Sequence, residues 1–388
     1  MNQSIIRAWW SARQGLDGAL VGKRPSEVLE RSGWARSVAG AGPYLTLFSR
    51  AGTSREAADQ ALERVEIHEL PAARGCTYVV PSGDYGLALK VGQEFGKAEM
   101  KVAYKLGVTD KEVDKLCEAV VKVLGKGPLD PSQIREATGK ASRNLGEEGK
   151  KKGITTTLPL ALGRLQYEGE IRRIPIDGRL DQQRYRYSLW RPNPLSKFRL
   201  SLDEAYTELA RLYFRWIGPA TAVQFQAFSG LGVKAGKNAI EPLNLVPVEQ
   251  GSDLLMFAAD RDSLMTFQPP SKPQYVVVSS LDAMALLRND IKSLMDDKDV
   301  QTHKPGSFGE FPNHAILDRG KLVGLWEYDT EAAKIVWSCF VNKDKALEAA
   351  VAAAEKYVRE QLGDARSFSL DSPKSRAPRI AALRKAAR

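Results

Sequence analysis

The sequence contains few of the residues that build disulfide frameworks and metal sites. Three cysteines and three histidines are spread over 388 residues, and Cys76, Cys117 and Cys339 have no paired spacing. Disulfide scaffolds use clustered cysteines in even number, and structural zinc sites use ligands at short, regular spacings. We therefore expect no metal, no cofactor, and a reducing, cytoplasmic compartment.

Long apolar runs are also lacking. No stretch approaches the ~20 consecutive apolar residues that a membrane helix needs, and the opening residues MNQSIIRAWW contain no hydrophobic signal region. Hydrophobic residues make up 43% of the chain and charged residues 27%, as in ordinary globular proteins. The length is suitable for about two to four domains, and we expect no membrane partner.

Acidic charge is in deficit. The chain has 57 Lys and Arg against 47 Asp and Glu, which gives a net charge of +10 and a pI near 9.3. Such a balance favours a polyanionic partner, with nucleic acid ahead of an anionic membrane.

One short pattern occurs three times. Residues 127–139 (GPLDPSQIREATG) and 218–230 (GPATAVQFQAFSG) share an initial Gly-Pro, a central Gln with an apolar residue, and a hydroxyl residue before the last glycine. A looser copy is PSEVLERSG at 25–33. In the 127–139 copy, Asp130 is a good N-cap and Gly139 a good stop. Each copy therefore predicts a short helix.

The second copy is followed by a helix and a hairpin. In 155–170, Leu158, Leu162 and Leu165 fall on one helical face. Segments 170–178 and 184–190 then read as two strands, because polar and apolar residues alternate in the latter. The other two copies have similar successors. Helix, helix, helix and hairpin is the order of a winged-helix unit.

The second unit contains the residues expected of a DNA contact. A winged helix places its third helix in the major groove, and wing arginines bind phosphates. Between 135 and 186 there are twelve Lys and Arg against seven Asp and Glu. The candidate DNA-binding residues are Arg164, Gln166, Arg172, Arg173, Arg184, Arg186, Lys150, Lys151 and Lys152. A solvated helix-hairpin used for protein contact is the alternative, and for the three lysines a mobile loop.

The remainder of the chain is richer in strands. Residues 275–281 and 314–341 predict antiparallel strands, and 343–364 an alanine-rich helix. After Asp371 the chain has six cations and no acid, which predicts disorder or a loose nucleic-acid arm. The predicted fold class is α+β: three tandem winged-helix domains (1–100, 101–195, 196–258), a small antiparallel β-barrel-like domain with a C-terminal helix (259–364), and a basic disordered tail (365–388).

Four stretches resemble the AlkZ-like family of crosslink-repair DNA glycosylases: 42–52, 69–81, 214–231 and 318–329. The resemblance extends over most of the chain. It implies an enzyme that removes alkylated purines, such as N7-alkylguanine, from double-stranded DNA without a cofactor. It also leads us to expect a monomer that is cytoplasmic and nucleoid-associated.

The sequence departs from this family at its catalytic motif, Gln-apolar-Gln or Gln-apolar-Asp. Counting back from Tyr44, the two motif positions fall on Arg36 and Val38. Val38 cannot orient water, and Arg36 brings positive charge toward a cationic transition state. Nearby replacement candidates are Ser37 and Asp84, and also Glu66 and His68, with structural roles as the alternative for each. Asp84 also suits the N-cap of a helix beginning near Tyr85.

The sequence therefore predicts a winged-helix DNA-binding protein of this family, with the glycosylase activity altered or lost. A non-catalytic DNA-binding protein, either a regulator or a damage binder, is the alternative. A protein-interaction scaffold built from the same helices is a third possibility.

Overall fold

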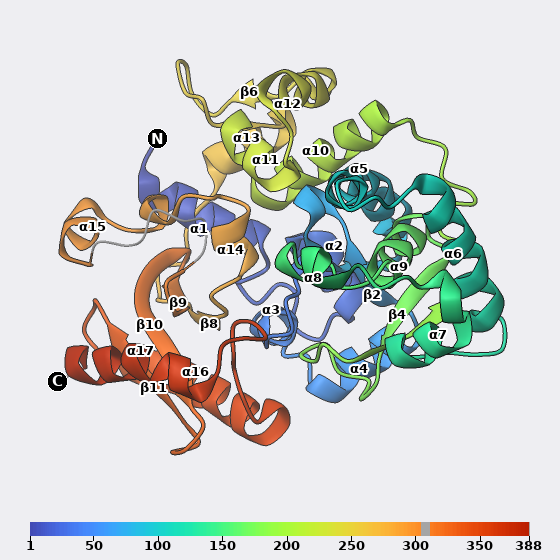
Figure 1. The fold of residues 1–388 in the computed structure, drawn as a ribbon. Coiled ribbons are helices and arrows are strands. Elements are labelled where there is room, and N and C mark those ends of the chain that lie inside the picture. Colours follow the sequence, from blue (N-terminus) through green and yellow to red (C-terminus); the bar gives the residue numbers. More distant parts are fainter. Residues whose placement is uncertain (304–310, 388) are drawn as a thin grey trace.

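The first segment of the chain surrounds a three-stranded sheet with helices (Figure 1). The computed structural model describes residues 1–303 and 311–387. The helices are α1 (Gln3–Arg13), α2 (Pro25–Ser32), α3 (Gly42–Ala51) and α4 (Arg55–Glu63). The strands β1 (Ala35–Arg36), β2 (Ile67–Pro71) and β3 (Thr77–Pro81) are antiparallel in the order β1-β3-β2. This order places Arg36 opposite Tyr78.

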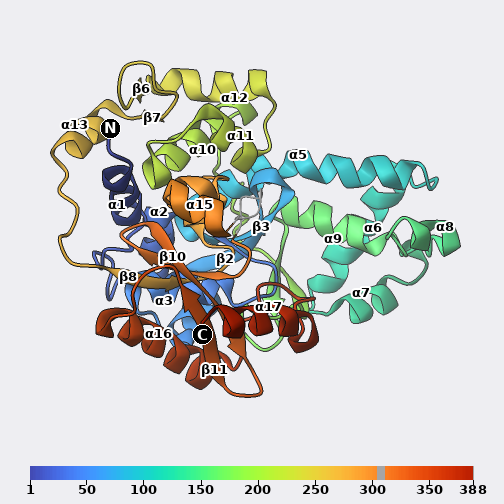
Figure 2. The ribbon, with the colours of Figure 1, turned by 90° about the vertical axis from the view of Figure 1, so that its left-hand side faces the viewer.

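The second segment has its own hydrophobic core and extends to one side of the molecule (Figure 2). Its predicted capping box is present, because Asp130 accepts from the amides of Ser132 and Gln133 while Gln133 Oε1 accepts from the Asp130 amide. Leu162 and Leu165 are buried as expected. The elements are α5 (Tyr85–Tyr104), α6 (Asp110–Leu124), α7 (Pro131–Thr138), α8 (Gly146–Lys151), α9 (Leu158–Tyr167), β4 (Ile171–Pro175) and β5 (Tyr185–Leu189).

The third segment shares a core with the beginning of the chain. The indole N–H groups of Trp9 and Trp10 donate to the carbonyls of Gly218 and Pro219, at 2.9 and 3.0 Å. Helix α1 therefore packs on the third segment although it comes first in the sequence. The elements are α10 (Leu202–Ile217), α11 (Ala222–Ser229), α12 (Val233–Ile240), β6 (Val246–Pro247), β7 (Leu255–Met256) and α13 (Ala258–Thr266).

The C-terminal sheet is open, so the expectation of a barrel-like domain is not met in the described residues. Its strands are antiparallel in the order β11-β10-β9-β8, and the two edge strands do not pair with each other. Closure would need that pairing. Helices pack against these strands instead. The elements are β8 (Tyr275–Val278), α14 (Ala283–Leu286), α15 (Asp297–His303), β9 (His314–Asp318), β10 (Lys321–Asp329), β11 (Lys334–Cys339) and α16 (Lys345–Tyr357).

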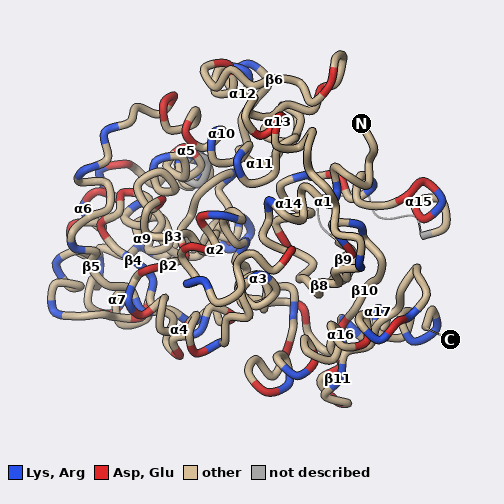
Figure 3. Tube along the Cα trace, turned by 180° about the vertical axis from the view of Figure 1, so that it is seen from behind, with Lys and Arg blue, Asp and Glu red and all other residues tan. Residues whose placement is uncertain are grey.

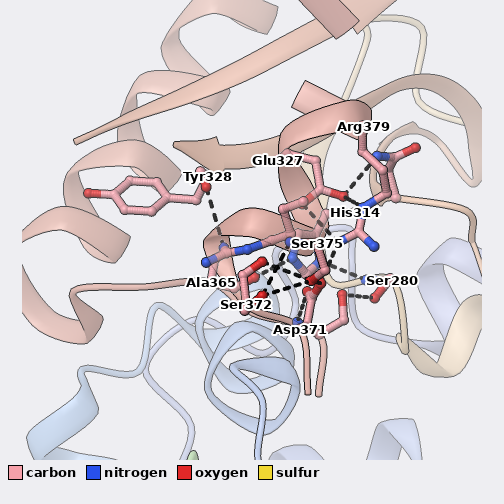
Figure 4. A network of polar contacts seen from close by, with 12 residues as sticks. Ser280, His314, Glu327, Tyr328, Ala365, Asp371, Ser372, Ser375 and Arg379 are labelled. Carbon is pink, nitrogen blue, oxygen red and sulfur yellow. Dashed lines mark hydrogen bonds and ion pairs between the residues drawn. The ribbon is translucent and has the colours of Figure 1, made fainter. Parts of the chain in front are cut away.

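The basic tail forms a docked helix, so the prediction of a disordered tail at 365–388 is wrong for α17 (Pro373–Ala386). Arg376 is fully buried and binds both carboxylate oxygens of Asp364, at 2.7 and 3.0 Å. Arg379 pairs with the buried acids Glu327 and Asp371, each at 2.8 Å (Figure 4). The tail composition alone misleads because these acids lie before the helix in the sequence, two of them far from it.

No helix in the described ranges is both long and apolar enough to cross a bilayer.

Candidate functional site

Arg36 lies beside a pocket between the first and second segments. Its Nη1 donates to the carbonyl of Thr77 at 3.0 Å, and its guanidinium lies 5.5 Å from the centre of the Tyr78 ring. Thr77 is part of the pocket wall. The first motif position of the resembled family therefore presents a cation close to a cavity.

This cavity, which we call the central pocket, measures about 510 Å³ and is open to solvent. It lies between the β2–β3 turn, α7, α9 and the β4–β5 hairpin. Its volume falls in the ~300–1,000 Å³ range of small-molecule sites. The polar side chains that line it are Thr77, Ser132, Arg135, Thr155, Thr156, Gln166, Tyr167, Arg173 and Tyr187.

Two of the predicted DNA-binding residues line the central pocket. Gln166 donates from its amide to the Leu162 carbonyl at 3.0 Å, and its Oε1 accepts no hydrogen bond from the described residues. Arg173 lies 4.7 Å from the centre of the Tyr185 ring, and its Nε has no partner in the described part of the chain. Within the described residues, the Gln166 Oε1 is therefore available to a ligand, whereas the Arg173 Nε is buried without a partner.

Arg135 also lines the central pocket, although the sequence reasoning did not single it out. It is exposed on α7 and has no acid within ion-pair distance among the described residues. In the sequence, Arg135 is only one of the twelve Lys and Arg that outnumber Asp and Glu between 135 and 186. Nothing in the sequence placed α7 beside the β2–β3 turn of the first segment.

Arg164 lies outside the central pocket and is already paired. Its guanidinium contacts Asp114 at 2.5 Å and Glu168 at 2.9 Å. The hydrogen bond to Glu168, reinforced by Asp114, raises the pKa of Arg164. The sequence missed this pairing because Asp114 belongs to α6, which packs against α9.

The lysine cluster lies at the end of a short helix rather than in a loop. Lys150 and Lys151 are exposed and lie 3.8 and 3.1 Å from Glu147 and Glu148 on the same helix. Lys152 is exposed at the C-cap of α8. Exposed pairs of this kind contribute little energy, so these lysines can exchange their partners for phosphates.

The wing residues differ in accessibility. Arg184 and Arg186 are exposed on the hairpin and have no ion pair among the described residues, whereas Arg172 is half-buried in a different cavity. Lys and Arg are intermixed with Asp and Glu along this segment (Figure 3). The charge pattern alone therefore identifies few DNA-binding positions. Ion pairs with neighbouring acids decide which cations are free.

Ser37 and Asp84 are both held by buried partners. Ser37 is 2% exposed and donates its hydroxyl to Glu69. Asp84 accepts from the Trp34 indole N–H at 2.9 Å, and burial raises the pKa of Asp84 to about 6. Asp84 stands at the N-cap of α5, but its side chain caps no helix amide. The expected cap is therefore absent because Trp34 takes the carboxylate.

The other two candidate catalytic residues, Glu66 and His68, are also held by the fold. Glu66 pairs with Arg64 at 2.8 Å. His68 is 1% exposed, and burial lowers the pKa of its imidazole to about 3. His68 is therefore neutral near pH 7. In the described residues no group of three or more His, Cys, Asp or Glu side chains could hold a metal ion.

The loop that carries Val38 is paired with residues 364–371, which we call the strap. The Ser369 amide donates to the Val38 carbonyl at 3.0 Å, and the Ala41 amide donates to the Arg366 carbonyl at 2.8 Å. A Cβ on Gly40 would lie 2.2 Å from the carbonyl oxygen of Ser367. The glycine-rich sequence here is thus required by close backbone approach.

The strap also reaches the tip of the β4–β5 hairpin. Arg366 donates from Nε to the Ala39 carbonyl at 2.9 Å and from Nη2 to the Asp181 carbonyl at 2.6 Å. The Tyr44 hydroxyl accepts from the Leu180 amide at 2.9 Å. The hairpin tip therefore rests on the protein, and its sides, rather than its tip, are open to a ligand.

Comparison with known proteins gives two findings. The family model described as DNA glycosylase AlkZ-like matches residues 36–367. The structure is similar to the solved Streptomyces sahachiroi DNA glycosylase AlkZ, with a TM-score of 0.71 and 17% identity over 95% of this chain and 98% of that one. A search of curated proteins gave no match. Helix α17 lies beyond the range that the family model matches.

Proposed function

The chain belongs to the AlkZ-like DNA glycosylase family, and on that premise we propose that it binds alkylated double-stranded DNA through three tandem winged-helix units and acts in its repair. The observation that carries this proposal is the central pocket. It lies between two of the helix-and-hairpin segments, has room for one base, and is lined by Arg135 and Arg173, with Arg36 beside it.

The proposed reaction is hydrolysis of the N-glycosidic bond of an N7-alkylated purine. Water adds to the sugar carbon C1′, and the bond to the purine nitrogen N9 breaks. The bonding electron pair passes to the purine and neutralises the positive charge of the N7-alkylated ring, and the water loses a proton to solvent. Because the leaving group is already activated, the site needs mainly to extrude the base and hold the water.

Gln166 is the residue that we propose holds the water. Among the described residues that line the central pocket, it is the one amide side chain, and none of them is a carboxylate. Its Nε2 is fixed on the Leu162 carbonyl, which leaves Oε1 to accept from a water. Arg135 and Arg173 would bind the flanking phosphates.

A second candidate function is non-catalytic recognition of damaged DNA. It is favoured by Arg36 and Val38, which occupy the positions where the family carries its water-holding side chains. A guanidinium beside a developing oxocarbenium ion is unfavourable, whereas the same cation would attract a phosphate.

The test is a single-turnover assay with a duplex containing one N7-methylguanine, followed by alkaline cleavage of abasic sites. We expect strand cleavage above a protein-free control, and a loss of about 100-fold in rate for Gln166→Ala. Gln60→Ala, at an exposed position of α4, is the matched control. Tight binding of the methylated duplex without cleavage would instead select the second candidate.

A further inference from the structure

A second cavity lies on the opposite face of the β4–β5 hairpin from the central pocket. Arg172 and Arg173 are consecutive in β4, paired with Ser188 and Tyr187, so their side chains point to opposite faces. Arg173 lines the central pocket, whereas Arg172 lines a separate cavity of about 590 Å³. We call this cavity the lateral pocket; its chemistry comes from Tyr85, Arg172, Trp190, Arg191, Lys197 and Phe198.

The lateral pocket has uncompensated positive charge. Arg172 is half-buried, burial lowers its pKa, and it forms no ion pair within the described residues. Lys197 is exposed and likewise unpaired there. Arg191 is neutralised by Glu170 at 2.9 Å. A partly desolvated guanidinium without an internal acid is costly to the fold, which points to an anion supplied from outside.

The acids near this pocket do not provide that anion. Glu66 is close enough to raise the pKa of Tyr85, after the larger effect of burial, but it is paired with Arg64. Asp84 is bound to Trp34. His68, behind the aromatic wall, is kept neutral by burial and by the charges of Arg172 and Arg173. Within the described residues, Arg172 and Lys197 of this pocket therefore have no acidic partner.

Aromatic rings form a firm wall of the lateral pocket. The Tyr85 and Trp190 ring centres are 5.2 Å apart, and the His68 ring lies 5.1 Å from that of Trp190. Phe198 lies against Gly86, where a Cβ would come within 2.6 Å of its ring. Bases stack on aromatic side chains of this kind.

The start of α5 adds hydrogen-bond donors. Ser82 and Gly83 line the pocket and precede this helix of 20 residues. Asp84 gives the helix no side-chain cap, and the Tyr85 amide already donates to the Ser82 carbonyl, so the amides without a side-chain cap are those that follow Tyr85. Such amides and the positive end of the helix dipole favour a phosphate.

From these observations we propose that the lateral pocket binds a phosphate ester carrying a planar base, that is, a single nucleotide unit. Arg172, Lys197 and the start of α5 would hold the phosphate, and the aromatic wall would hold the base. The unit is either a free mononucleotide or part of a DNA strand. The site uses none of the groups proposed for base removal, so it stands independently of glycosylase activity.

Calorimetric titration with 5′-deoxyguanosine monophosphate tests this proposal, with deoxyguanosine and inorganic phosphate as part-ligands. We expect binding to the wild type that is at least 10-fold tighter than to Arg172→Ala, and weaker binding of either part-ligand. Lys234→Ala, at an exposed position of α12 outside both pockets, is the control and should bind the nucleotide as the wild type does. Lys197→Ala, at an exposed position, gives a second test that cannot be attributed to misfolding.

A duplex titration identifies the source of the nucleotide. Equal loss of nucleotide and duplex binding in Arg172→Ala assigns the pocket to a DNA strand, and loss of nucleotide binding alone assigns it to a free nucleotide. The proposal is overturned if the wild type does not bind the nucleotide, or if Arg172→Ala and Lys197→Ala bind it as the wild type does. Failure of the glycosylase assay leaves these readings unaffected.

Discussion

Arg173 and Arg164 belong to the same predicted DNA-binding set but differ in whether an acid of the protein already pairs with them. Both were expected to contact DNA, yet Arg164 is bound by Asp114 and Glu168 while Arg173 has no acidic partner in the described residues. The free energy gained by a phosphate contact comes largely from counterion release. A cation that is already paired with an acid of the protein gains less of this free energy from a phosphate contact.

We expect Arg173→Ala to weaken binding to all duplexes alike and to flatten the dependence of log affinity on log salt by about one unit. Arg164→Ala is the matched control and should leave this slope nearly unchanged. Fluorescence anisotropy at several salt concentrations measures both. Equal slopes for Arg173→Ala and the wild type would remove the central pocket from the DNA interface.

Asp84 makes the free energy of unfolding depend on pH. Burial raises its folded-state pKa to about 6, above the unfolded value, so its ionisation opposes folding. Stability from this group is therefore present below pH ~4 and is lost as pH rises through about 6. We expect Asp84→Asn, which keeps an acceptor for Trp34, to add on the order of 1–2 kcal/mol at pH 7 and nothing near pH 4. Urea unfolding at both pH values tests this, and equal gains at both would contradict it.

At the scale of elements, the strap connects the loop 38–41 to the hairpin tip by main-chain hydrogen bonds. Gly40→Ala should disrupt this pairing, because the added Cβ meets the Ser367 backbone at 2.2 Å. We expect a loss of about 1–3 kcal/mol in the free energy of unfolding. Gly232→Ala, where a Cβ meets nothing within 4 Å, is the control. Equal stability of the two variants would mean that the strap does not press on the loop.

Helix α17 is held by ion pairs with buried acids. Arg379→Met would leave Glu327 and Asp371 without their guanidinium, and uncompensated buried charge costs about 3–5 kcal/mol. We expect that loss at pH 7. Lys385→Met, at an exposed position of the same helix, should have little effect. Chemical denaturation distinguishes the two variants.

At the scale of the whole molecule, the net charge of +10 leaves many Lys and Arg side chains of the described residues without an ion pair. Within the described residues, the unpaired cations near the central pocket and hairpin include Arg135, Lys152, Arg172, Arg173, Arg184 and Arg186. If about four of them contact phosphates, the salt slope for a duplex is about −4. We expect that slope from a monomer in analytical ultracentrifugation. A slope near zero would favour the protein-interaction scaffold, and a stable dimer would favour a regulator that reads two half-sites.

Several features could be predicted from the sequence because they depend on neighbours along the chain. The capping box at Asp130 and Gln133, the buried face of α9 and the β4–β5 hairpin follow from local spacing. The family was also evident from short motifs. The wall of the central pocket was not, because it brings Thr77, Arg135 and Gln166 together from three separate elements.

The sequence by itself determined the local elements, the basic balance and the departure from the glutamine motif, since each is a property of residues close together in the chain. The tertiary structure alone decided which cations are free, because Asp114, Glu327 and Asp364 reach their arginines only through packing. It likewise left the C-terminal sheet open and ordered the tail as α17. Ion pairing and sheet closure join distant residues, and no local pattern specifies which ones will meet.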